Sequence, residues 1–232
     1  MRFYLLSSLA HAPLSGLGIC QQPRNPFVPN PALRALLVAL DHWASAGAQP
    51  PDSRVPRRED GTLVPSIPQS EVGFPSIPGV TYNGLMTTGD LFNYGSTLDQ
   101  GVLSNLPPIF VGSPYVVLVP KTDGDGHDIA GIQLPEIAVP IATYTGWGLR
   151  AAPFAGNDLC DAAGQKIDFK RTALERIAAG DPRLSIEERY PTHGSYVNAV
   201  ARAANSLHKQ GFLLAEDLER YVQVASESDI GK

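Results

Sequence analysis

The 232-residue sequence has few cysteines, no long hydrophobic run and no excess of positive charge. A helix that spans a bilayer needs about 20 apolar residues in succession, so a membrane is not expected as a partner. The net charge of −5 argues against nucleic acid as the main partner. Cys20 and Cys160 form no disulfide framework. They could pair if the fold brings them together, but buried free thiols are the more common arrangement and are expected here.

Complete catalytic motifs are also missing. The sequence has no G-x-S-x-G, H-E-x-x-H, paired Cys-x-x-Cys or P-loop, and its nearest strings, GSPYV and HGSYV, lack the second glycine of a nucleophile elbow. Asp123, Asp125 and Asp128 suggest a calcium loop, but the sixth and twelfth positions are not the Gly and Glu that such a loop requires. We therefore expect no metal and no cofactor, and we interpret these aspartates as the solvated tip of a β-hairpin over 114–134.

The chain opens with MRFYLLSSLAHAPLSG, which allows two interpretations. Ala10-His11-Ala12 has the A-x-A pattern of a signal-peptidase site, but a secretory apolar region needs about 7–15 residues and Ser7-Ser8 interrupt this one. The aromatic and aliphatic residues instead predict a β-strand over 1–10, followed by a small-residue turn that presents His11. The compartment stays undetermined.

The composition divides the chain into three segments. Residues 1–50 hold the first strand, the His11 loop and a helix that Asn30 would cap and Gly47 would end. Residues 51–165 form a Pro/Gly-rich wrap that includes the hairpin. Residues 166–232 form a helical tail, in which Ser185 and Glu188 predict a capping box. The predicted fold class is mixed α/β.

Aromatic and charged residues in TYTGWGLR are candidates for the wall of a substrate pocket. Tyr144 and Trp147 would supply aromatic surface and Arg150 a cation for a carboxylate, and Tyr82 in VTYNG is an element of the same kind. The alternative is a tight turn fixed by a buried Trp, with Arg150 bonded to backbone carbonyls. Glu136 lies in an apolar string and, if it is buried, Arg150 is its expected partner.

Three strings occur in a specific order: LLSSLAHAP, GICQQPRNP and LRALLVALDHWASAGAQPPDSRVP. This succession resembles the C-terminal portion of the large bacterial alpha/beta-hydrolase domain family of serine hydrolases. It is also similar to the C-terminal ends of tannase and feruloyl-esterase-like enzymes. The resemblance continues over nearly the whole chain through strings in the same order, which are IPGVTYNGL, GIQLPEIAVPIATYTGWGLR, ERIAAGDPRLSIEERY and QGFLLAEDLERYV.

The resemblance implies an α/β-hydrolase fold and the hydrolysis of small-molecule esters. His11, after the last sheet strand, would be the triad base. Family members are longer chains whose serine and acid lie upstream of everything seen here, so we expect this chain alone to be inactive. An upstream half is the expected partner, or a second copy that associates through the exposed first strand. The alternative is a stand-alone, non-catalytic binding or assembly module derived from the same fold.

Overall fold

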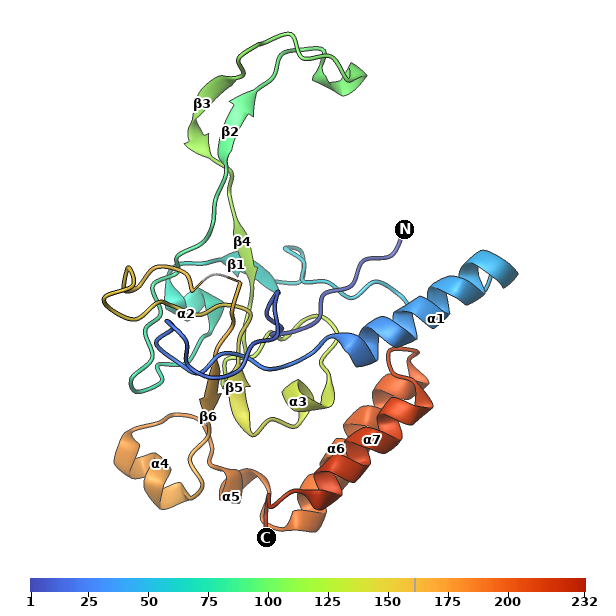
Figure 1. Cartoon of the computed structure of the whole chain (residues 1–232), viewed down its shortest axis with the longest axis vertical. Coiled ribbons are helices and arrows are strands. Elements are labelled where there is room, and N and C mark those ends of the chain that lie inside the picture. Colours follow the sequence, from blue (N-terminus) through green and yellow to red (C-terminus); the bar gives the residue numbers. More distant parts are fainter. Residues whose placement is uncertain (161) are drawn as a thin grey trace.

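The computed structural model describes residues 1–160 and 162–232. Figure 1 shows an irregular central body, an arm that projects from it, and a group of long helices along one side. These helices are α1 (Asn30–Ala46), α6 (His193–Lys209) and α7 (Ala215–Glu227). Their shared core includes Ala32, Ala204 and Phe212, which are all buried. The described residues contain no helix that is long and apolar enough to cross a membrane.

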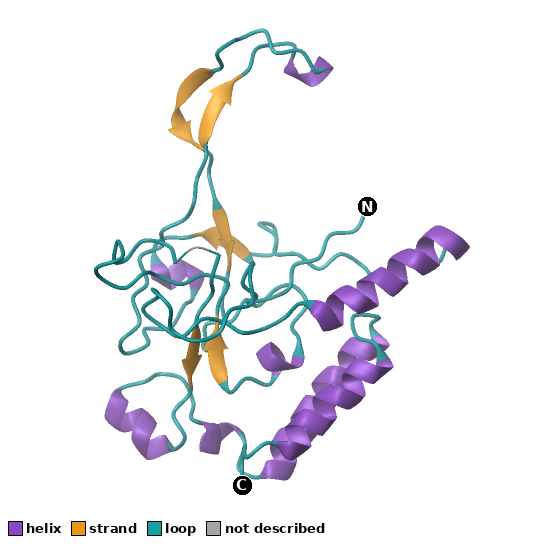
Figure 2. Ribbon diagram, in the orientation of Figure 1, coloured by secondary structure: helices purple, strands orange, loops and turns teal. Residues whose placement is uncertain are grey.

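The described strands form three antiparallel pairs, and none of them belongs to a larger sheet. The pairs are β1 (Leu63–Pro65) with β4 (Leu118–Pro120), β2 (Asp90–Asn93) with β3 (Ile109–Pro114), and β5 (Ala142–Tyr144) with β6 (Lys166–Asp168). The short helices are α2 (Gln69–Val72), α3 (Pro135–Ala138), α4 (Ala173–Ala179), α5 (Ile186–Arg189) and the 3-10 turn η1 (Leu98–Gln100). The mixed α/β class is confirmed (Figure 2).

The helix predictions hold with small shifts at their ends. α1 begins at Asn30 itself, preceded by Pro29, so Asn30 does not act as the side-chain cap. It ends as expected at Gly47, whose φ of +70° suits a residue without a Cβ atom. Ser185 and Glu188 form the predicted capping box at the start of α5.

The predicted strand over residues 1–10 is wrong. Only single bridges form, where Tyr4 meets Arg54 and Leu6 meets Ile132. The chain bends at Ser8, whose φ is +57°. The Ser7 hydroxyl donates to the carbonyl of Ala130 (2.6 Å), so polar contacts turn the segment away from an extended course.

The hairpin predicted over 114–134 is also wrong. β4 pairs with β1 and not with residues 129–134. The intervening turn does close on itself, through a bridge between Thr122 and Asp128. Its tip is only partly solvated, because Gly124 is exposed whereas His127 is fully buried. Arg189 donates a hydrogen bond to the carboxylate of Asp125, and this contact fixes the turn against the body.

The β-hairpin that does form is the arm, residues 85–117, which contains β2, η1 and β3 and projects from the body in Figure 2. Every residue of β3 is exposed. Asp90 and Asp99 are the only charged residues of the arm. Its exposed apolar side chains are Leu85, Phe92, Leu98, Val102, Leu103, Leu106, Ile109, Phe110, Val111, Tyr115 and Val116.

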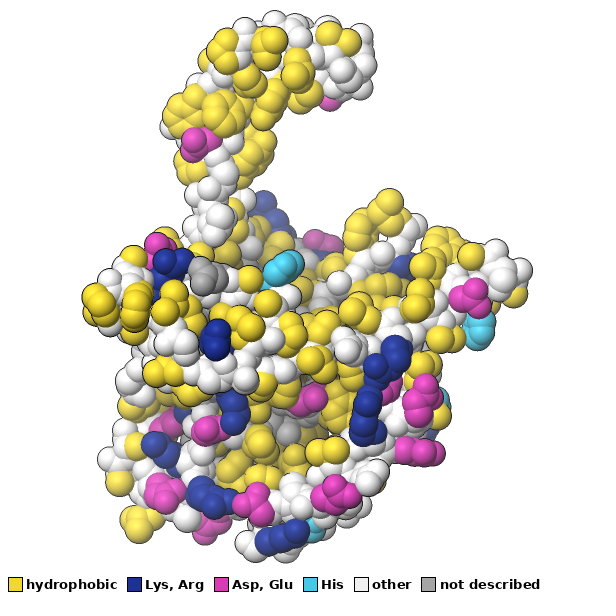
Figure 3. Space-filling view, viewed as in Figure 1, with side chains coloured by type: hydrophobic (Ala, Val, Ile, Leu, Met, Phe, Trp, Pro, Cys, Tyr) yellow, Lys and Arg dark blue, Asp and Glu magenta, His cyan; other side chains and the backbone are white. Residues whose placement is uncertain are grey.

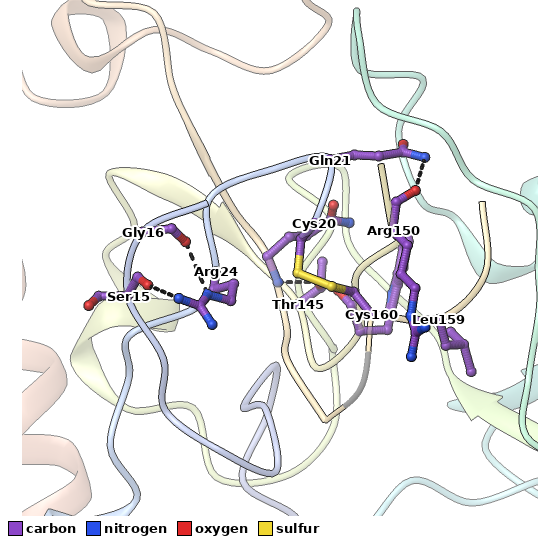
Figure 4. Close-up of a disulfide and its surroundings, with 11 residues drawn as sticks. Ser15, Gly16, Cys20, Gln21, Arg24, Thr145, Arg150, Leu159 and Cys160 are labelled. Carbon is purple, nitrogen blue, oxygen red and sulfur yellow. Dashed lines mark hydrogen bonds between the residues drawn. A yellow bond between two sulfur atoms is a disulfide. The ribbon is translucent and has the colours of Figure 1, made fainter. Parts of the chain in front are cut away.

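Cys20 and Cys160 form a disulfide, which corrects the expectation of free thiols (Figure 4). Both residues are buried. Their segments are brought together by the strip 148–151: Gln21 N–H donates to the Leu149 carbonyl and Cys160 N–H to that of Gly148, both at 2.8 Å. Nothing in a sequence separation of 140 residues indicates this proximity.

We expect loss of the disulfide to lower the free energy of unfolding by about 2–5 kcal/mol, because the bond closes a very long loop in the unfolded chain. Urea denaturation of the Cys20→Ser/Cys160→Ser protein against the parent measures this difference. Thiol titration of the unreduced, unfolded parent should find no free cysteine. An unchanged unfolding midpoint after reduction would contradict a stabilising role.

Candidate functional site

His11 lies exposed in a loop that is held against two other segments. Leu9 precedes it, and its carbonyl oxygen lies so close to Gly146 that a Cβ atom there would be 2.8 Å away. Ala10 is buried beside Gly164, where an added Cβ atom would lie 3.1 Å from that of Ala10. The two glycines therefore allow the His11 loop to approach the backbone of both neighbouring segments.

Asn25 connects these segments from within and is fully buried. Its side-chain amide donates to the carbonyls of Ser8 (2.9 Å) and Thr145 (3.1 Å), and its side-chain oxygen accepts from the N–H of Phe27 (3.0 Å). Its backbone N–H donates to Gly164 (3.0 Å). One amide thus fixes the strip before His11 relative to the TYTGW segment.

A cavity of about 250 Å³ lies beside Leu9. Its aromatic wall consists of Phe74, Tyr82 and Trp147, whose ring centroids are 5.3–5.5 Å apart in pairs. Tyr82 is fixed by a hydrogen bond from its hydroxyl to the carbonyl of Ser66 (2.6 Å). The remaining lining residues are Leu5, Leu6, Leu9, Val72, Asn83, Gly84, Leu85, Met86, Val119, Pro120, Thr122, Asp128 and Gly146. We call this the Trp147 cavity.

Asp128 is the acidic group in the wall of the Trp147 cavity. Its carboxylate accepts the N–H of Ser8 (2.7 Å), and its own N–H donates to the Ser8 hydroxyl oxygen (2.8 Å). Burial raises the pKa of Asp128 to about 6, in spite of that hydrogen bond, and the nearby Asp123 adds to the rise. The sequence interpretation missed this residue because it assigned the whole turn to solvent.

His127, next to Asp128, is fully buried, and burial lowers its pKa. Its Nε2 lies 3.1 Å from both the Tyr144 nitrogen and the Ala142 oxygen, while its Nδ1 has no hydrogen-bond partner among the described residues. Asp123, Asp125 and His127 cluster closely enough to bind an ion. However, one Asp123 oxygen accepts hydrogen bonds from two backbone N–H groups of the turn. The carboxylate of Asp125 accepts a hydrogen bond from Arg189. Both carboxylates are therefore engaged in contacts that stabilise the turn within the protein itself.

The structure separates the four predicted pocket residues. Tyr82 and Trp147 lie together in the Trp147 cavity. Tyr144 is buried on another side, against Phe27 (centroid distance 4.0 Å). Arg150 donates through Nε to the carbonyl of Leu159 (2.9 Å), in keeping with the tight-turn alternative.

The expected pairing of Glu136 with Arg150 is wrong. Glu136 accepts a hydrogen bond from the hydroxyl of Tyr221 (3.0 Å). Arg150 lies instead in an antiparallel contact with Cys20, on the disulfide side of the body. Tyr221 belongs to the helical tail and is far from Glu136 in the sequence. Arg150 was the predicted partner because it is much closer to Glu136 along the chain.

A catalytic serine beside His11 is not found in the part of the chain that the structure describes, where no hydrogen bond joins the imidazole to another side chain. The site consists of an exposed histidine, an aromatic cavity beside its loop, and an acid held by the segment before it. A histidine acts as a general base only when a nucleophile comes within hydrogen-bond reach.

A family model described as Alpha/beta hydrolase domain matches residues 8–223, which is most of the chain. The protein therefore belongs to the alpha/beta hydrolase domain family. Searches of curated proteins and of solved structures found no match.

We expect the Asp128→Asn variant to change how stability depends on pH. Asp in an unfolded chain titrates near pH 3.9, whereas Asp128 in the folded protein titrates near pH 6. Between these values the unfolded chain loses its proton first, so the free energy of unfolding of the parent falls as pH rises, by on the order of 2 kcal/mol. The variant should not show this fall.

Urea denaturation at pH 4 and pH 7 measures the difference between the two proteins. Asp99→Asn, on the exposed arm, is the matched control and should follow the parent at both pH values. If the stability difference between Asp128→Asn and the parent is the same at pH 4 and pH 7, the carboxyl does not titrate in this window.

Proposed function

We propose that this chain is the C-terminal part of a serine hydrolase that cleaves small-molecule esters, and that His11 is its general base. The observation that supports the proposal is the position of His11. Leu9, two residues before it, lines the Trp147 cavity, and His11 itself is exposed, so a nucleophile from outside the chain could reach it. Membership of the alpha/beta hydrolase domain family agrees with hydrolase chemistry.

In this proposal the serine, the orienting acid and the oxyanion hole come from an upstream segment. The His11 imidazole would accept the proton of the serine hydroxyl as that oxygen attacks the ester carbonyl. It would then return the proton to the leaving alcohol, and would activate water in the same way to release the acid. The described chain supplies the base and one wall of the site.

The Trp147 cavity would hold the apolar group of the ester. A volume of about 250 Å³ suits a small acyl or alcohol group, and three aromatic rings provide a flat apolar surface. Asp128 borders the same space and is protonated in part near neutral pH, so it could donate a hydrogen bond to an ester oxygen.

The test combines this chain with the serine-bearing upstream segment of a longer family member and follows the hydrolysis of p-nitrophenyl butyrate. We expect activity that falls at least about 1,000-fold in His11→Ala, because loss of a triad base leaves only binding and oxyanion stabilisation. His42→Ala is the control, since His42 is exposed on α1 away from the cavity, and it should keep the parent rate.

Retained activity in the His11→Ala protein would overturn the role of His11. Substantial hydrolysis by this chain without the upstream segment would overturn the shared-site proposal, because the base would then act with a group of this chain.

The second candidate function is a non-catalytic assembly module, and the apolar arm favours it. Phe92 and Phe110 face each other across the strand pair and are both exposed. Residues 1–10, which were expected to offer an open edge, are flanked by Arg54 and Ile132, so self-association would engage the arm more readily.

We expect this module to self-associate in sedimentation measurements between about 1 and 100 μM, and Phe92→Ser/Phe110→Ser to shift it toward the monomer. The burial of two aromatic side chains contributes a large part of the energy of a small interface. A parent protein that stays monomeric over this range would count against the assembly function.

A further inference from the structure

A second cavity, of about 440 Å³, lies where the start of α1 meets α3, α6 and α7. Figure 3 shows hydrophobic side chains in a hollow on this face, beside the long helices. It is separate from the Trp147 cavity, and the two share no lining residue. We call it the Glu136 cavity. Its remaining lining, apart from the groups discussed below, is Val28, Asn30, Pro31, Pro135, Val139, Ile141, Val200, Val224 and Ala225.

Aromatic rings form much of the wall of the Glu136 cavity. Phe27 and Tyr144 contribute a pair of rings from the body, whose centroids are 4.0 Å apart. Tyr196 from α6 and Tyr221 from α7 line it from the helical side. The face of an aromatic ring is negative, so several rings around one space favour a cation over an anion of the same shape.

Glu136 is the acid in this wall and has no basic partner among the described residues. Among side chains, the Tyr221 hydroxyl donates a hydrogen bond to its carboxylate (3.0 Å), and its own backbone N–H donates a second. Burial raises its pKa, and the hydrogen bonds from its own backbone N–H and from Tyr221 oppose the rise in part. These hydrogen bonds bring no positive charge to the carboxylate, and a cation in the cavity would supply that counter-charge.

The two arginines of the cavity wall are already engaged. Arg34 and Arg220 both bind Asp217, which is almost completely buried. Arg34 donates from Nε to one Asp217 oxygen at 3.1 Å and from Nη2 to the other. Neither arginine contacts Glu136. Both arginines of the wall thus bind Asp217, and the acidic group among the aromatic rings has no basic partner among the described residues.

We propose that the Glu136 cavity binds a small organic ammonium compound, with the positive nitrogen held between Glu136 and the aromatic rings and the apolar part against the aliphatic wall. A volume of about 440 Å³ accepts a quaternary or substituted ammonium with a short apolar substituent. This site is independent of ester hydrolysis, since it shares no residue with the His11 loop or the Trp147 cavity.

Three probes of nearly the same shape test the proposal. Choline carries the positive charge, 3,3-dimethylbutan-1-ol is its neutral analogue, and 3,3-dimethylbutanoate is an anionic one. Isothermal titration calorimetry with the intact chain should show choline binding at least tenfold more tightly than the neutral alcohol. The anion should bind more weakly than either.

Two variants locate the binding. Glu136→Gln keeps the size of the side chain and removes its charge, so it should reduce the choline affinity at least tenfold while the affinity for the neutral alcohol stays within about twofold. Glu219→Gln is the matched control, because Glu219 is exposed on α7 near Tyr221 but does not line the cavity. It should bind choline like the parent.

If Glu136→Gln does not fold, Val224→Trp provides the alternative, because Val224 lies exposed at the rim and a larger side chain there should block all three probes. Equal binding of choline and the alcohol would overturn the proposal, as would unchanged choline binding in both variants. Preferred binding of the anion would also overturn it, since that result would assign the site to Arg34 and Arg220.

Discussion

The hydrogen bonds of Asn25 are the constraint on which the rest of the site depends. A buried amide with all of its groups satisfied fixes the segments that it joins, because any displacement leaves a polar group unpaired. Asn25 joins the strip that ends in His11 to the segment that carries Trp147. The bend at Ser8 then brings Asp128 to that strip, so histidine, aromatic wall and acid share one anchor.

The TYTGW segment separates the two cavities. Successive side chains of an extended strand point to opposite faces. Thr143 therefore turns to the buried Arg183, whose Nη1 donates to its hydroxyl (2.8 Å), while Tyr144 turns to the Glu136 cavity. Trp147 follows the close approach at Gly146 and faces the other cavity. A short run of residues that looked like one pocket wall in the sequence thus serves two cavities.

Features that depend on local chemistry could be predicted from the sequence. The end of α1 at Gly47 and the capping box at Ser185 follow from the residues at those positions, and the helices form as expected. The family could also be inferred, because several unusual strings keep their order along the chain.

Features that depend on distant pairing could not be predicted. Three contacts join residues that are far apart in sequence: the pairing of β1 with β4, the hydrogen bond from Tyr221 to Glu136, and the disulfide between Cys20 and Cys160. Asp128 was misjudged for the same reason, since its carboxylate is bound by the N–H of Ser8, 120 residues away. Single-residue patterns contain no information about which distant segment will cover them.

The disulfide has a consequence for the exposed arm. Cys20 and Cys160 close a covalent ring, and residues 85–117 lie within it. Exposed hairpin tips are preferred sites of proteolytic cleavage. A protease that cuts the arm would open the ring without releasing either product, because the sulfur bridge still joins the two pieces. Cleavage of the arm and loss of the His11 loop from the rest of the molecule are therefore separate events, because the second also requires reduction of the disulfide.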